Sequence, residues 1–113
     1  KPDDYEILPE RFSKEPLGPT VRQGDENWLG LVRWTLFAPL EAEEYGITQQ
    51  NVDQQLKSAN PHIQRILGVT PGLGKNLGVD DKWAYQIIRQ LGNYGEIYER
   101  TLGMPSALKL ARG

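Results

Sequence analysis

The spacing of apolar residues predicts that most of this chain is helical. Between residues 28 and 40, apolar side chains recur every three or four positions, which is typical of an amphipathic helix with one side against a core. Asp25 precedes this segment and can cap it, because its carboxylate can accept hydrogen bonds from the free N–H groups of the first turn. The residues expected on the core-facing side are Trp28, Leu29, Val32, Leu36, Phe37 and Leu40.

One proline interrupts this apolar pattern. Pro39 lacks an N–H group and its ring clashes with the preceding turn, so we expect the helix to kink or break near residues 35–38. Gly46 is suited to the left-handed conformation that commonly ends a helix. The sequence therefore predicts a long, bent helix that ends at Tyr45.

The sequence of the central part of the chain predicts a shorter helix and a loop. Thr48 can cap a helix over residues 49–58, in which Val52 and Leu56 would form one narrow buried edge. The helix over residues 49–58 is therefore expected to lie on the surface with this one edge buried. Glycine is frequent over residues 68–78, which predicts a loop with several turns.

Two further helices have recognisable start signals. Asn60 followed by proline predicts a short helix over residues 61–67, since proline is well tolerated at the first helical position. Either Asp80 or Asp81 can cap a helix over residues 82–91.

The last predicted helix follows directly. Gly92 can end the preceding helix, and Asn93 with Glu96 three residues later forms a capping-box pattern. Residues 107–111 would be helical if the chain continued beyond them.

Two short strands are expected at the start of the chain. Tyr5, Ile7 and Leu8 suit a strand, and a second strand is predicted over residues 19–23, where β-branched side chains favour an extended backbone. Gly24 then permits the turn into the long helix. The predicted fold class is mainly α with two short strands, an α+β fragment.

Length and composition fit one soluble domain at most. The chain has 113 residues, of which 38% are hydrophobic and 25% charged, values that argue against disorder. The net charge of −2 gives no general attraction to nucleic acid, and the absence of cysteine excludes disulfides and zinc–thiolate sites. The chain begins without methionine and stops within what looks like a continuing segment. We interpret it as a piece of a longer protein.

The sequence offers no constellation for catalysis or metal binding. His62 is the one histidine, and no partner acid or nucleophile can be assigned to it, so a solvated surface position is expected. Asp80 and Asp81 form a cap doublet without the further oxygen ligands of a calcium loop. A cluster of glutamates near the end of the long helix is expected to be solvated: Glu41, Glu43 and Glu44. We expect no catalytic residue, no metal site, no cofactor and no enzymatic activity.

The three tryptophans could line a ligand cleft or pack in the core. Trp28 and Trp83 match the apolar sides of their helices, so core packing is predicted for both. Trp34 falls off the main apolar stripe of its helix and is the candidate for another role.

A glycine-rich turn suggests an alternative function. Residues 70–74, TPGLG, are close to the turn of helix–hairpin–helix units, whose backbone N–H groups contact a DNA phosphate. The second helix would have to cross Gly78 and the acidic pair that follows, where a helix and basic charge are required. A small helical module with a DNA-binding turn at residues 70–78 is thus the alternative to the function described next.

Three stretches resemble a known family. PLGPTVRQGD at residues 16–25, followed by the tryptophan-rich helix, resembles the late part of a periplasmic amino-acid-binding protein of an ABC importer, in which such a strand returns from one lobe to the other. NYGEIYER at residues 93–100 is similar to the closing helix of that family, and PGLGKNLG at residues 71–78 is similar to the general L-amino-acid-binding subgroup. The resemblance implies a two-lobe α/β type II parent fold.

The resemblance also implies how the chain is organised. Residues 1–24 would form a strand–loop–strand returning between lobes, and residues 25–113 the helical C-terminal part of the first lobe, with an insertion at residues 46–79. The crossing between lobes would be a hinge, whose residues are Glu15, Pro16, Leu17, Gly18 and Pro19. The main contacts to the amino acid are expected upstream of Lys1, so no ligand-binding residue is assigned here.

The partners implied are those of the whole parent. They are L-amino acids, captured between the lobes, and the membrane subunits of an ABC permease, with an exported parent in the periplasm. Nucleic acid is not an expected partner under this interpretation. Taken alone, the chain would leave strand edges and the apolar side of residues 28–40 uncovered, so we expect it to self-associate.

Overall fold

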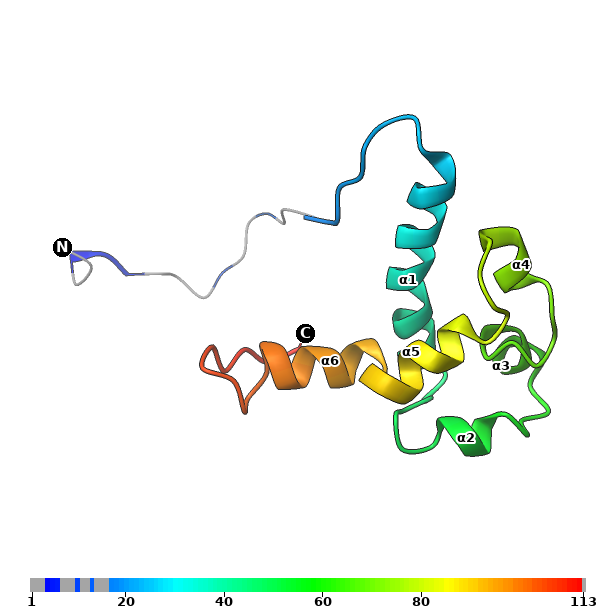
Figure 1. The fold of residues 1–113 in the computed structure, drawn as a ribbon. Coiled ribbons are helices and arrows are strands. Elements are labelled where there is room, and N and C mark those ends of the chain that lie inside the picture. Colours follow the sequence, from blue (N-terminus) through cyan, green and yellow to red (C-terminus); the bar gives the residue numbers. More distant parts are fainter. Residues whose placement is uncertain (1–3, 7–9, 11–12, 14–16, 113) are drawn as a thin grey trace.

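The computed structural model describes residues 4–6, 10, 13 and 17–112, and the regular elements of this part of the chain are six helices (Figure 1). No strand occurs among the described residues. The helices are α1 Glu26–Glu44, α2 Val52–Gln55, α3 Pro61–Ile66, α4 Leu73–Leu77, α5 Trp83–Leu91 and α6 Tyr94–Thr101.

The longest helix and the last two helices form the frame of the fold. α1 packs against α4, α5 and α6, while α2 packs against α5. In Figure 1, α5 and α6 follow one another across the end of α1, and α2, α3 and α4 are grouped around α5. The side chains of the buried core come from α1, the segment between α1 and α4, and α5: Ala38, Ala42, Ile47, Val52, Ile63, Ile66, Leu67, Trp83, Ala84, Tyr85 and Ile88.

α1 begins as predicted but is not broken at its proline. The carboxylate of Asp25 accepts a hydrogen bond from the Trp28 N–H at 2.9 Å, which caps the first turn. We expected a kink or a break near residues 35–38; the helix runs without interruption through Pro39, so the break is wrong. Pro39 is buried, and its packing against the core can offset the loss of one backbone hydrogen bond. The helix ends at Glu44 with Tyr45 as its C-cap, and Gly46 has a left-handed φ of +65° as predicted.

The buried side of α1 is not the side that the apolar pattern indicated. Trp28 and Phe37, both expected in the core, are 52% and 42% exposed. The residues that are buried are small and lie near the C-terminal end: Ala38, Pro39 and Ala42. Trp34, which lies off the main stripe, is half-buried and packs against the core cluster. The core prediction is therefore wrong for Trp28 and correct for Trp83, which is 9% exposed.

No second strand forms where the sequence predicted one. Residues 17–22 are irregular and lead into a turn at Gln23 and Gly24. A strand exists only when its backbone groups pair with a neighbour, and no described segment lies beside this one as a strand. Tyr5 is likewise irregular, and Ile7 and Leu8 of the first predicted strand lie outside the described residues.

The segment after α1 contains less helix than predicted. Instead of a helix over residues 49–58, only α2 forms, after a turn over residues 49–51 that begins at Thr48. The Thr48 N–H donates to Asn51 Oδ1 at 2.8 Å, and the Asn51 N–H donates to Thr48 Oγ1 at 3.2 Å. Val52 is still fully buried and Leu56 half-buried, so the predicted apolar edge is correct.

Two further boundaries differ from the prediction. The glycine-rich stretch contains the short helix α4, where only a loop was expected. Residues 107–111 are irregular instead of helical, and Lys109 has φ +49°. By contrast, α3 begins after Asn60, whose side chain accepts from the His62 N–H, as predicted.

The end of the described chain is tied back to α1. Arg112 binds Glu43 through two nitrogen–oxygen contacts of 2.8 and 2.7 Å, and its guanidinium lies 4.8 Å from the ring centroid of Tyr94 and 5.7 Å from that of Tyr98. Such a planar fork is the geometry that favours arginine over lysine. This contact bridges α1, α6 and the C-terminal segment.

The junction of α5 and α6 connects the fold through side chains. Asn93 is 6% exposed, and it forms the predicted capping box with Glu96: Asn93 Oδ1 accepts from the Glu96 N–H and Glu96 Oε2 accepts from the Asn93 N–H, both at 2.9 Å. Asn93 Nδ2 also donates to the Ile47 carbonyl at 2.9 Å, and Glu96 Oε2 also accepts from the Gln49 N–H at 3.0 Å. The box therefore holds the chain that follows α1 as well as its own helix.

Replacing Asn93 by alanine should destabilise the protein more than the replacement of an exposed polar residue does. The change removes a cap and leaves the buried Ile47 carbonyl without its donor, so we expect a loss of about 2–4 kcal/mol in the free energy of unfolding. Urea denaturation followed by circular dichroism would measure it.

Asn27→Ala is the matched control, since Asn27 is exposed in α1 and its substitution should change stability by less than about 0.5 kcal/mol. Equal effects of the two substitutions would contradict the structural role assigned to Asn93.

Candidate functional site

The described part of the predicted hinge is exposed and open. Leu17 is 92% exposed, and apart from Gly18 and its two chain neighbours no atom of the described residues lies within 4 Å of the position that a Cβ would take at Gly18. Pro19 lies against α1 and lines a hollow there. Glu15 and Pro16 lie outside the described residues. The hinge remains a prediction, since it concerns movement between lobes.

An apolar hollow lies beside the N-terminal half of α1. Its volume is about 360 Å³, and we call it the α1 groove; its lining residues are Pro19, Trp28, Leu31, Val32, Thr35 and Leu36. A second hollow of about 260 Å³ shares Pro19, Val32 and Leu36 with it. The Thr35 hydroxyl donates within the helix, to the Leu31 carbonyl at 2.8 Å, so it does not offer a free donor. The α1 groove can bury apolar surface, and no charged side chain lines it.

The glycine-rich turn has a geometry suited to an anion, and an internal carboxylate fills it. The N–H groups of Gly72 and Gly74 each donate to Asp81 Oδ1 at 3.0 Å, and that of Lys75 at 3.4 Å. Converging backbone N–H groups of this kind form the concavities that bind phosphate in other proteins. A Cβ at Gly74 would overlap the Asp80 carbonyl, which explains why the turn requires glycine there. Asp81 is therefore part of this turn, and Asp80, whose Oδ1 accepts from the Lys82 N–H at 2.8 Å, lies at the start of α5.

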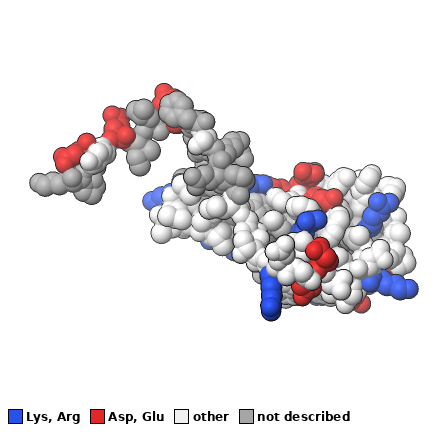
Figure 2. All heavy atoms as spheres, turned by 90° about the horizontal axis from the view of Figure 1, so that it is seen from above, with Lys and Arg blue, Asp and Glu red and all other residues white. Residues whose placement is uncertain are grey.

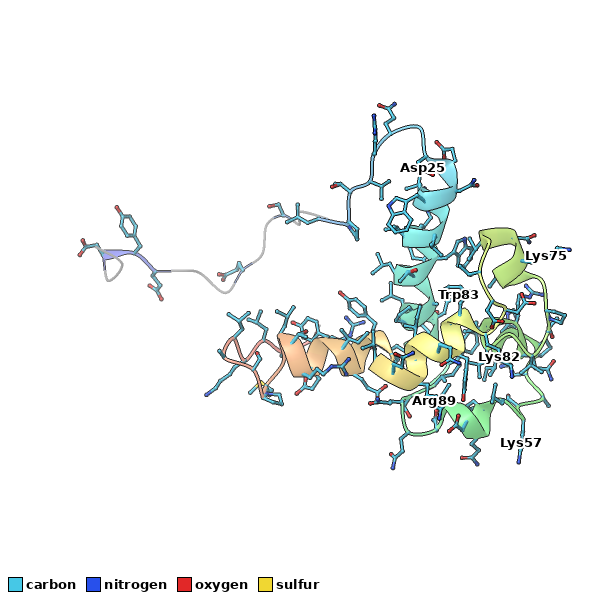
Figure 3. All side chains as sticks on the ribbon, viewed as in Figure 1. Asp25, Lys57, Lys75, Lys82, Trp83 and Arg89 are labelled. Carbon is cyan, nitrogen blue, oxygen red and sulfur yellow. The ribbon has the colours of Figure 1, made fainter. Side chains whose placement is uncertain are left out.

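This arrangement removes the basis for the DNA-binding alternative. The N–H groups that would contact a phosphate are already bonded to Asp81, and α4 ends at Leu77 instead of running through the acidic pair. On the face shown in Figure 2, lysine and arginine are scattered among acidic and neutral residues without a continuous basic patch. Figure 3 shows Lys57, Lys75 and Arg89 on separate elements.

No catalytic or metal-binding arrangement is formed by the residues that the structure describes. His62 is exposed, and its ring stacks on that of Tyr45 with a centroid distance of 5.8 Å and an interplanar angle of 14°. Across the described ranges, no three histidine or carboxylate side chains come together as metal ligands. In the same residues no helix is both long and apolar enough to span a membrane.

Several contacts between distant residues were not anticipated from the sequence. The Tyr85 hydroxyl donates to Asp53 Oδ1 at 2.6 Å, a hydrogen bond that raises the pKa of Tyr85 because it favours the protonated phenol. Gln49 Nε2 donates to the carbonyls of Arg89 and Gln90 at 3.2 and 3.1 Å. The residues of each pair are far apart in the sequence, so no local sequence pattern predicts these contacts.

The chain was compared with models of protein families, with curated proteins and with solved structures. No model of a protein family matches the chain. The general L-amino acid-binding periplasmic protein AapJ of Rhizobium johnstonii is 54% identical over 114 residues, which cover 99% of this chain and 33% of that protein. The glutamate/glutamine/aspartate/asparagine-binding protein BztA of Rhodobacter capsulatus is 49% identical over 111 residues, covering 97% of this chain and 33% of that protein.

A solved structure shows the same fold. It is that of an ABC transporter periplasmic binding protein from Brucella ovis with glutathione bound; the TM-score is 0.86 at 57% identity, covering 99% of this chain and 36% of that one. The chain is thus homologous over nearly all its length to periplasmic solute-binding proteins of ABC transporters. Among these it matches amino-acid-binding members, which confirms the resemblance found in the sequence. The chain spans about a third of the length of the curated relatives it matches.

The internal anion contact predicts a specific acid sensitivity. The pKa of Asp81 is lowered below its ordinary value of 3.8, because backbone N–H groups stabilise the ionised carboxylate. The Gly72 N–H has the largest effect, followed by those of Lys75 and Gly74. The resulting stability is fully present above pH 3.8 and is lost as the pH falls through the lowered pKa of the folded state. Asp81→Asn should therefore be less stable than the native chain at pH 7, and this difference should shrink below pH 3.8.

Thermal unfolding monitored by circular dichroism at pH 7, 4 and 3 would measure that difference. Glu44→Gln is a suitable control, since Glu44 is an exposed carboxylate near the end of α1. A difference between native chain and Asp81→Asn that stays constant over this pH range would refute the electrostatic role of Asp81.

Proposed function

We propose that this chain is the C-terminal portion of an extracytoplasmic solute-binding protein, which captures L-amino acids and delivers them to an ABC permease. The observation that supports this most directly is the match to amino-acid-binding relatives at 49–54% identity over nearly the whole chain. The structural match with a TM-score of 0.86 supports the same assignment. The complete protein would lie in the periplasm, as its relatives' names state for them.

In this proposal the present chain contributes structure to the first lobe and the approach to the hinge. A zwitterionic amino acid enclosed between two lobes requires charged partners of both signs, and excluding water strengthens those contacts. The α1 groove offers apolar surface instead, with no charged residue in its lining. The enclosed ligand would therefore be held mainly by the other two thirds of the parent, and residues 15–19 would form the hinge.

The same proposal explains why an apolar groove is exposed. Trp28 and Phe37 are half-exposed, although burying a large apolar side chain stabilises a protein by roughly 1.5–3 kcal/mol. In the complete protein, further chain would cover this side of α1. In the isolated chain, a second copy is the available cover, and we propose self-association through the α1 groove.

The complete protein should bind L-amino acids and close around them. Isothermal titration calorimetry with the standard L-amino acids should give saturable binding, and small-angle scattering should show a smaller radius of gyration with the bound ligand. Closure of this kind is expected from a hinge between two lobes.

D-amino acids provide the control for recognition of the ligand. Absence of binding across the L-amino acid panel would overturn the proposed function, whereas binding without compaction would overturn the hinge alone.

The isolated chain should form dimers or larger species at micromolar concentration. Trp28→Asp places a charge at the α1 groove and should shift the chain toward the monomer, because burying an unpaired charge in an interface is unfavourable. Sedimentation velocity would measure the distribution of species.

Leu108→Asp is the matched control, since Leu108 is also exposed but lies outside the α1 groove. A strictly monomeric native chain, or an equal effect of the two substitutions, would contradict this proposal.

A further inference from the structure

A third hollow, with different chemistry, lies between α1 and α3. Its volume is about 160 Å³, and we call it the α1–α3 groove. One wall comes from the C-terminal half of α1 and its cap, the other from α3, and Leu73 of α4 closes one side. Its lining residues are Trp34, Glu41, Tyr45, His62, Arg65, Ile66 and Leu73.

The groove carries opposite charges on opposite walls. Glu41 belongs to α1 and Arg65 to α3, and within the described part of the chain neither takes part in an ion pair. Glu43, two residues away, differs in this respect, because Arg112 binds it through two contacts. Glu41 and Arg65 therefore remain available to a ligand, one as an acceptor for a cation and the other as a planar donor for a carboxylate.

The remaining lining residues give the groove a defined shape. The rings of Tyr45 and His62 stack on each other and join the two walls. Trp34 packs edge-on against Phe37, with ring centroids 6.0 Å apart and an interplanar angle of 82°. Ile66 is buried in the core. Charged groups thus lie beside apolar and aromatic side chains in one hollow.

We propose that the α1–α3 groove is a binding site for a small free zwitterion of the α-amino acid type. Arg65 would bind its carboxylate and Glu41 its ammonium group, with the aliphatic part against Trp34 and Ile66. The volume decides the size class, since about 160 Å³ is well below the 300–1,000 Å³ of pockets for drug-sized ligands. The site lies on this chain alone, so it does not depend on the ligand cleft of the parent protein.

Nuclear magnetic resonance of the 113-residue chain can test this site directly. The three tryptophans give three indole N–H signals, and only Trp34 lines the groove. Titration with L-alanine should shift the Trp34 signal saturably, with a Kd of about 1–10 mM as expected for a small, partly open site. The Trp28 and Trp83 signals should not move.

Ligand analogues and variants identify the two charged contacts. Propionate, which lacks the ammonium group, and ethylamine, which lacks the carboxylate, should each bind at least about ten-fold more weakly than L-alanine. Arg65→Ala and Glu41→Gln should weaken L-alanine binding by a similar factor, and Arg65→Lys by less, because it keeps the charge but loses the planar fork. Arg33→Ala and Glu44→Gln, on α1 outside the groove, should have no effect.

Three outcomes would overturn the proposal. They are no saturable Trp34 shift up to about 50 mM L-alanine, equal binding of propionate and L-alanine, and unchanged binding in Arg65→Ala with the helical content intact. None of these outcomes bears on amino-acid binding by the complete protein, which is measured separately.

Discussion

The buried capping box at the start of α6 is the contact on which the rest of the described fold depends. Asn93 and Glu96 satisfy each other's backbone N–H groups, which by itself would only begin a helix. The same two side chains each make one further contact to the segment that follows α1. Asn93 Nδ2 donates to the Ile47 carbonyl, and Glu96 Oε2 accepts from the Gln49 N–H. Because these groups lie more than 40 residues apart, the local signal for one helix also fixes the path of another part of the chain.

Features that depend on a few neighbouring residues could be predicted from the sequence. Four features depend on neighbouring residues in this way: the cap at Asp25, the end of α1 before Gly46, the start of α3 after Asn60 and the capping box at Asn93. In each case one side chain or one missing Cβ satisfies or permits a backbone conformation within four residues, so the tertiary structure has little influence.

Features that depend on a partner could not be predicted in this way. The apolar pattern of α1 correctly indicated a helix with an apolar side, but Trp28 is exposed because the described chain supplies no surface against it. Residues 19–23 have the composition of a strand, but the part of the chain that the structure describes places no strand beside them. Asp81 is a candidate cap for α5 in the sequence, but Lys82 occupies the N-cap position without a side-chain cap bond, and Asp81 instead accepts from the glycine-rich turn. The contact of Arg112 with Glu43 spans 69 positions, beyond any pattern in the sequence.

The glycine-rich turn has a consequence for how such sites could arise. Three backbone N–H groups converge on one oxygen of Asp81, so the geometry of an anion receptor already exists and is merely occupied from within. Loss of that single carboxylate would leave these three N–H groups without their acceptor. A structural turn and a phosphate-binding turn can therefore differ by a single amino-acid substitution. A glycine motif alone does not reveal which of the two a protein contains.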